Sequence, residues 1–165
     1  MSQERHVISV EVQNKAGVLA RIAGLFSSRG FNIDSLAVGE TEDPGHSRLT
    51  LVTRGDDAVV EQIRKQLNRL IDVLKVHEFD GEDYVERDLL LLKVTAPAGK
   101  RGEIMQIADV FRGRIVDVGA KHLMIELSGP ESKVNAIIDL LRPYGIKEMV
   151  RSGRIALTRG AKGAD

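Results

Sequence analysis

The residues from Asn14 to Gly17, in the string NKAG, could bind a small molecule that carries two opposite charges. Asn14 has an amide oxygen and an amide nitrogen on one short side chain, enough to hold an ammonium group and fix the loop. Gly17 stands where a helix is predicted to begin, and first-turn N–H groups have no partner within the helix and carry the positive end of its dipole. Because glycine has no Cβ, a carboxylate can approach these N–H groups closely. The two residues therefore predict an amino-acid site.

The same residues also have a purely structural interpretation, because Asn and Gly are common in turns for their backbone tolerance alone. The surrounding strings are more specific than this spacing. NKAG followed by an apolar helix resembles the effector-binding loop of ACT domains, and SSRGFNIDSLAVG, at 27–39, is similar to the matching stretch of the acetolactate synthase (acetohydroxyacid synthase) small-subunit family. Further similar strings are GDDAVVEQIRKQLNRLIDVLKV, VERDLLLLKV and RSGRIALTRG, so the resemblance runs from about His6 to Gly160.

Two apolar periodicities predict the elements that position this loop. Apolar residues alternate between His6 and Gln13, which is typical of a half-buried strand, and apolar residues three and four apart after Gly17 predict a helix that ends at Gly30. The residues 43–45, Asp-Pro-Gly, have the composition of a turn between two further strands. The predicted order is βαββαβ, with strands at 6–13, 31–39, 47–54 and 73–79 and helices at 17–30 and 56–71.

The same order begins again after a short polar link at 81–83. Its predicted strands are 88–96, 115–118, 123–127 and 146–150, and its predicted helices centre on 104–111 and 134–141. We therefore predict an α+β protein of two consecutive ferredoxin-like βαββαβ sandwiches. The resemblance implies that the N-terminal one is an ACT domain.

These predictions divide the chain into two domains. Residues 1–80 would bind the effector and dimerise, and residues 81–165 would form a C-terminal ferredoxin-like domain. Ile155 and Leu157 are expected to add a short extra strand. Each predicted sheet leaves one face and two edges uncovered, and in ACT domains these surfaces usually carry dimerisation.

The composition limits the class of partner and the compartment. The 165 residues hold 24 basic and 24 acidic side chains, and this zero net charge argues against nucleic acid as the main partner. There is no Cys, which fits a reducing compartment, and no apolar run approaches the length of a membrane span. We predict a cytoplasmic protein that binds neither nucleic acid nor membranes.

The sequence has no pattern for catalysis or metal binding. Its four His residues lie far apart and Cys is absent, so neither a His pair nor a thiolate site is predicted. The basic Gly-rich loop at 98–102 could hold a phosphate, but it also has the composition of a common turn. We therefore expect no catalytic residues, no metal and no cofactor in this chain.

Ferredoxin-like folds also occur in other classes of protein. Acylphosphatase-like hydrolases need an Arg in the loop after the first strand, and Gln13 to Gly17 contain none. The alternative that stays open is a stand-alone ACT-type amino-acid sensor that regulates another enzyme or transcription. A transcriptional regulator would normally need a separate DNA-reading element, for which the two predicted sandwiches leave no room.

The resemblance implies a non-catalytic regulatory subunit of acetolactate synthase. Such a subunit binds the catalytic (large) subunit, raises its activity and makes it inhibitable by valine or a related branched-chain amino acid. Thiamine diphosphate, Mg²⁺ and FAD are expected in that catalytic partner, and nothing in this chain is expected to bind them.

The resemblance also implies which residues bind the effector. In ACT-domain homodimers the effector lies between the loop of one protomer and the second strand of the other. The implied effector-binding residues are Asn14, Ala16, Gly17 and Val18 from one chain and Asn32 and Ile33 from the other. Asn32 could instead cap a turn or pair along the sheet edge. The second repeat has Pro97 and Ala98 where the first has Asn14 and Lys15, so we expect no second site there.

Overall fold

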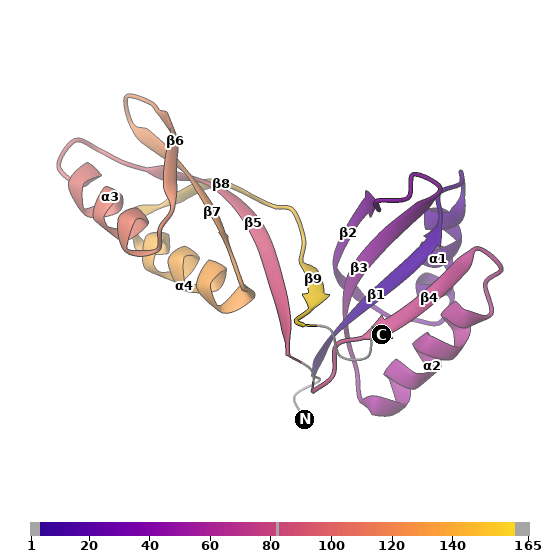
Figure 1. Ribbon diagram of the computed structural model, residues 1–165. Coiled ribbons are helices and arrows are strands. Elements are labelled where there is room, and N and C mark those ends of the chain that lie inside the picture. Colours follow the sequence, from indigo (N-terminus) through magenta and orange to yellow (C-terminus); the bar gives the residue numbers. More distant parts are fainter. Residues whose placement is uncertain (1–3, 82, 161–165) are drawn as a thin grey trace. The chain divides into compact units, whose positions relative to one another are not determined.

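The computed structural model describes residues 4–81 and 83–160, and the parts of the predicted domains at 1–3, 82 and 161–165 lie outside the described residues. The described chain forms two compact units, one of residues 4–81, 83–85 and 154–160 and one of residues 86–153 (Figure 1). The predicted domains at 1–80 and 81–165 stay a prediction. The compact units differ from them mainly at residues 154–160, which group with the first unit.

The first unit has the predicted βαββαβ order. Its elements are β1 (Arg5–Gln13), α1 (Val18–Ser28), β2 (Ile33–Glu40), β3 (His46–Arg54), α2 (Asp57–Asn68) and β4 (Val73–Glu78). The strands form an antiparallel sheet in the order β2-β3-β1-β4, and both helices lie on one of its faces (Figure 1). This is the ferredoxin-like fold that the sequence predicts.

The apolar stripes of the sequence form the core between this sheet and its helices. Alternate residues of β1 face the helices because strand side chains point to opposite faces in turn. The side chains that are nearly or fully buried there include Ile8, Val10, Val12, Val18, Ile22, Phe26, Leu49, Leu51, Val60, Ile63 and Leu67. Asp56 caps α2, since its carboxylate accepts a hydrogen bond of 2.9 Å from the N–H of Val59.

The opposite face of this sheet holds a second, smaller apolar cluster. Val7, Val52 and Phe79 are buried there together with Ala156, which comes from the C-terminal strand β9 (Ile155–Thr158). Tyr84 packs against the same cluster, with its ring centroid 5.0 Å from that of Phe79. The extra strand is confirmed, and it covers part of a sheet face that the sequence analysis left uncovered.

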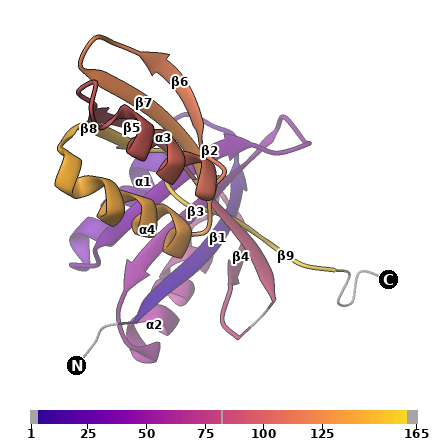
Figure 2. The ribbon, with the colours of Figure 1, turned by 90° about the vertical axis from the view of Figure 1, so that its left-hand side faces the viewer.

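The second unit repeats the same architecture. Its elements are β5 (Tyr84–Thr95), α3 (Arg101–Val110), β6 (Arg114–Val118), β7 (His122–Gly129), α4 (Glu131–Leu141), a 3-10 turn (Arg142–Tyr144) and β8 (Ile146–Arg151). The strand order is β6-β7-β5-β8, and β9 pairs with β5. In Figure 2, α3 and α4 lie side by side in front of the strands of this unit. The predicted internal repeat is confirmed.

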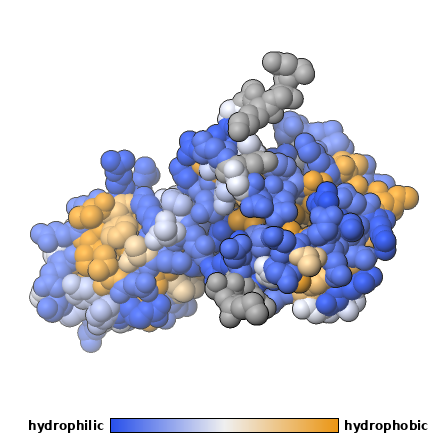
Figure 3. Space-filling view, turned by 90° about the horizontal axis from the view of Figure 1, so that it is seen from below, coloured by the Kyte–Doolittle hydropathy of each residue, from blue (hydrophilic) through white to orange (hydrophobic). Residues whose placement is uncertain are grey.

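The face of the molecule shown in Figure 3 is mostly polar, with apolar side chains gathered in patches. On β5, Leu90 and Leu92 are buried against the helices, whereas Leu89 and Leu91 alternate with them and are 43% and 39% exposed. No helix within residues 4–81 and 83–160 has both the length and the apolarity that a membrane span requires.

Candidate functional site

Gly17 is placed at the start of α1 as predicted. It adopts φ 86° and ψ −9°, a left-handed conformation that favours glycine, and no side chain caps the helix at this residue. The first turn of α1 also carries no acidic side chain. The N–H of Val18 donates a long hydrogen bond of 3.5 Å to the carbonyl of Lys15, and the N–H of Arg21 donates one of 3.0 Å to the carbonyl of Gly17. The start of α1 is thus exposed backbone of positive polarity, which suits an anion.

Asn14 fixes the loop that precedes this helix. Its Nδ2 donates hydrogen bonds of 3.0 Å to the carbonyl of Pro44 and 3.2 Å to the Glu40 carboxylate, and its backbone N–H donates one of 2.8 Å to the carbonyl of Gly45. The side chain is exposed. Within the described part of the chain its amide oxygen has no hydrogen-bond donor, so this oxygen is available to an ammonium group.

The two residues that flank Gly17 differ in their exposure to solvent. Ala16 is exposed, so a ligand can reach its backbone and its methyl group. Val18 is only 3% exposed, because its side chain belongs to the core beneath α1. The whole residue is buried and its N–H donates to the carbonyl of Lys15, so the role of Val18 in effector binding stays a prediction.

Asn32 and Ile33 lie at the start of β2. The Asn32 side chain is exposed and its Nδ2 donates to the Asp34 carboxylate, while its carbonyl accepts a hydrogen bond of 2.8 Å from the Thr53 hydroxyl. Ile33 is half-buried against the core. These contacts order the entry to β2, and the role of Asn32 as an effector ligand stays a prediction.

Within one chain, the predicted loop residues at 14–18 do not lie beside the predicted strand residues Asn32 and Ile33. Gln13, next to Asn14, pairs with His46 at one end of β3, whereas Ile33 pairs with Thr53 at the other end. Seven residues of strand separate these positions, a distance of about 23 Å at 3.3 Å per residue. Within a single chain the six predicted residues therefore form two sets at opposite ends of the sheet.

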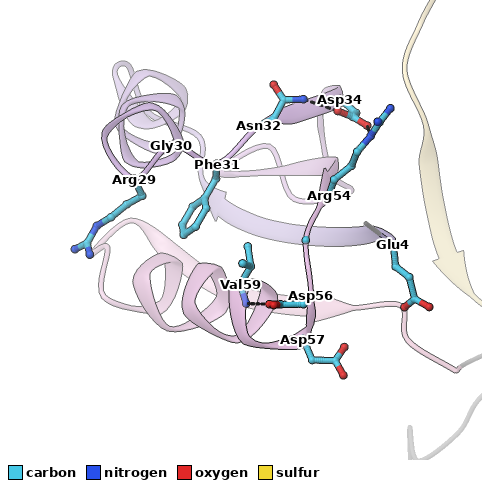
Figure 4. Close-up of a pocket in the computed structure, with 11 residues that line it drawn as sticks. Glu4, Arg29, Gly30, Phe31, Asn32, Asp34, Arg54, Asp56, Asp57 and Val59 are labelled. Atoms are coloured by element: carbon cyan, nitrogen blue, oxygen red, sulfur yellow. Dashed lines mark hydrogen bonds and ion pairs between the residues drawn. The ribbon is translucent and has the colours of Figure 1, made fainter. Parts of the chain in front are cut away.

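An open hollow of about 980 Å³ lies beside Asn32 in the first unit (Figure 4). Its lining residues are Glu4, Arg29, Gly30, Phe31, Asn32, Asp34, Arg54, Gly55, Asp56, Asp57 and Val59. No local sequence pattern predicts this hollow, because its walls come from three separate segments, at Glu4, between residues 29 and 34, and between residues 54 and 59.

Three of the charged groups that line this hollow are already engaged. Arg54 Nε lies 2.6 Å from the Asp34 carboxylate, and Asp56 is occupied as the cap of α2. Arg29 points away from the other labelled side chains in Figure 4. Because these polar groups do not converge on one point, the hollow by itself defines no ligand.

The clearest pKa shifts lie at exposed pairs outside the loop. The Arg64 guanidinium lowers the pKa of Glu61, the Tyr144 hydroxyl lowers the pKa of Glu103, and the His122 ring lowers the pKa of Asp117. In the described ranges, no group of three or more His, Asp or Glu side chains is arranged to hold a metal ion. The binding of an amino acid by the loop at 14–18 stays a prediction.

The comparisons with known proteins identify first the class of domain. Residues 8–75 match the family described as "AHAS small subunit-like ACT domain", and residues 87–160 match the family described as "Small subunit of acetolactate synthase". The first unit therefore contains an ACT domain, as the resemblance implied.

Relatives of known name cover almost the whole chain. A "Probable acetolactate synthase small subunit" of Archaeoglobus fulgidus is 56% identical over 158 residues, which are 96% of this chain and 99% of the relative. The "Acetolactate synthase small subunit" of Aquifex aeolicus is 50% identical over 94% of this chain and 81% of its own. The crystal structure of the acetolactate synthase small subunit from Thermotoga maritima superposes with a TM-score of 0.88 at 42% identity, covering 96% of this chain and 99% of that one. The chain belongs to the acetolactate synthase small-subunit family.

Proposed function

We propose that this chain binds the catalytic subunit of acetolactate synthase, raises its activity and makes it inhibitable by valine or another branched-chain amino acid. The observation that carries the proposal is the combination of near full-length family membership with an ACT-domain loop that offers both an amide oxygen, at Asn14, and a bare helix start, at Gly17. The chemistry of the reaction belongs to the catalytic subunit. Thiamine diphosphate, Mg²⁺ and FAD are proposed to bind there, and a cytoplasmic location is part of the proposal.

The effector would be held at its two charged ends. Its carboxylate accepts hydrogen bonds from the first-turn N–H groups of α1, where the missing Cβ of Gly17 leaves room. Its ammonium donates to the amide oxygen of Asn14, whose nitrogen already ties the loop to the turn at Pro44. This division of tasks within one side chain keeps the loop in place before the ligand arrives, so less ordering is needed on binding.

A homodimer through the β2 edge would complete the site. β2 is an edge strand of its sheet, so its outer side is free to pair with another strand. Two copies of β2 related by a two-fold axis run antiparallel, which puts the start of one beside the end of the other. Asn32 precedes the start of β2, and Asn14 is bonded to Glu40 at its end. This geometry supports a site that combines Asn14 and Gly17 of one copy with Asn32 and Ile33 of a second copy.

Reconstitution tests the proposed function directly. The purified chain is mixed with its acetolactate synthase catalytic subunit, and product formation is measured with and without valine; the catalytic subunit alone is the control. We expect activation by this chain and an inhibition by valine that the control lacks. No activation and no valine response would contradict the proposal. Valine binding by calorimetry without any effect on the enzyme would instead favour the stand-alone sensor.

A further inference from the structure

Arg21 lies directly beside the bare start of α1. A Cβ built on Gly17 would have the Nη1 atom of Arg21 as its nearest neighbour, at 3.8 Å. Arg21 stands four residues after Gly17, so its side chain returns along the helix toward the first turn, as long helical side chains do. A guanidinium N–H is thus next to the space into which the effector carboxylate is proposed to enter.

This guanidinium is held in place by an aspartate of a distant segment. Arg21 Nη2 is paired with the Asp72 carboxylate, whose side chain is only 12% exposed. Asp72 is itself fixed, because its carbonyl accepts a hydrogen bond of 2.8 Å from the N–H of Gln13, the last residue of β1. The ion pair therefore orients Arg21 through one nitrogen, while the side chain stays about half exposed. A held arginine loses less rotamer freedom when it binds a ligand than a free one does.

We propose that Arg21 is a further effector-binding residue, which donates from Nη1 to the ligand's α-carboxylate, with Asp72 as its positioning residue. The proposal rests on the proposed function of the Asn14 to Gly17 loop. Guanidinium groups bind carboxylates through charge-assisted hydrogen bonds that are roughly twice as strong as neutral ones. The ligand class that this residue selects is the α-amino acid with a free carboxylate, in preference to its amide or a simple amine.

The test compares valine with valinamide, in which a neutral amide replaces the carboxylate. Titration calorimetry measures both ligands on the full-length wild-type chain and on the double variant Arg21→Gln/Asp72→Asn. The double substitution removes both charges, so no buried carboxylate is left unpaired. We expect valine affinity to fall by about tenfold or more and valinamide affinity to stay nearly unchanged, so that the preference for valine is largely lost.

A purely structural role for Arg21 gives a different result, since a loosened loop weakens both ligands alike. An unchanged ratio of valine to valinamide affinity in a folded double variant would overturn the assignment of Arg21 alone. If the wild-type chain does not bind valine at all, the proposed function fails, and this assignment fails with it.

The variant Arg21→Lys keeps a cation beside Asp72 and provides a second measurement of the ratio of valine to valinamide affinity. It should retain part of the preference for valine, because lysine binds carboxylates only as a point charge, and a complete retention of the wild-type ratio would count against the proposal.

Discussion

The side-chain nitrogen of Asn14 donates a hydrogen bond of 3.0 Å to the carbonyl oxygen of Pro44, thirty residues further along the chain. This contact fastens the loop after β1 to the turn between β2 and β3. The oxygen of the same side chain accepts no hydrogen bond within the described residues, so one residue can both order the loop and offer an acceptor to the proposed ligand.

The substitution Asn14→Ala should weaken valine binding by about 1.5 to 3 kcal/mol, because it removes the charge-assisted acceptor for the ammonium. Calorimetry measures this loss, and Glu40→Gln is the matched control, since it keeps an oxygen acceptor for Asn14 Nδ2. The Asn14→Ala chain should still activate the catalytic subunit. An alanine variant that binds valine as tightly as the wild type would show that the amide is only structural.

The substitution Gly17→Asp should reduce valine affinity by at least tenfold, equivalent to about 1.4 kcal/mol. It puts a carboxylate and a Cβ where the ligand carboxylate is expected, and the positive φ of 86° adds local strain. Gly102→Ala in α3 is the control, because a Cβ there meets nothing within 4 Å. This control should leave affinity unchanged. Equal affinities of the folded Gly17→Asp and wild-type chains would exclude the helix start as the carboxylate site.

A site shared between two copies predicts that two variants with weakened valine binding complement each other. Homodimers of Asn14→Ala and of Asn32→Ala each carry a defect in both sites, whereas a mixed dimer carries both defects in one site and leaves the other intact. Equal mixing, with exchange of subunits, should restore about a quarter of the wild-type valine sites. Titration calorimetry before and after mixing measures the number of valine sites per dimer. If mixing restores nothing although native mass spectrometry detects mixed dimers, the two asparagines do not belong to one shared site.

The C-terminal strand should stabilise the first unit rather than the second. Ala156 is 5% exposed against Val7, Val52 and Phe79, so Ala156→Asp should destabilise this unit by roughly 2 to 4 kcal/mol. The neighbouring Ile155→Asp is the control, because Ile155 is 56% exposed. Hydrogen exchange followed separately in β1 and β7 measures the effect on each unit. Loss of protection in β7 alone would contradict this assignment of the strand.

Local patterns were sufficient to predict most of the fold. Each element is predicted from residues that are close in the chain. Examples are the apolar alternation in β1, the spacing of Ile22 and Phe26 in α1, and the turn before His46. The loop of Asn14 and Gly17 was found for the same reason.

The features that were missed depend on contacts between distant segments. Asp72 reaches Arg21 across 51 residues, and a short strand such as β9 carries no signal of which sheet it joins. The position of Val18 in the core likewise follows from the angle at which α1 packs on the sheet, which a four-residue motif cannot fix.

Residues 154–160 belong to the first unit, so this unit is completed only after the second unit has been synthesised. The ribosome synthesises the whole second unit, about 70 residues, between Val85 and the strand that covers Val7 and Phe79. At 5 to 20 residues per second this takes roughly 4 to 14 s. Until then Val7, Val52 and Phe79 of the nascent first unit lack the strand that packs on them, and chaperones and proteases act on exposed apolar clusters of this kind. A chain released before residue 155 lacks Ala156, so the apolar cluster at Val7, Val52 and Phe79 stays without this part of its cover.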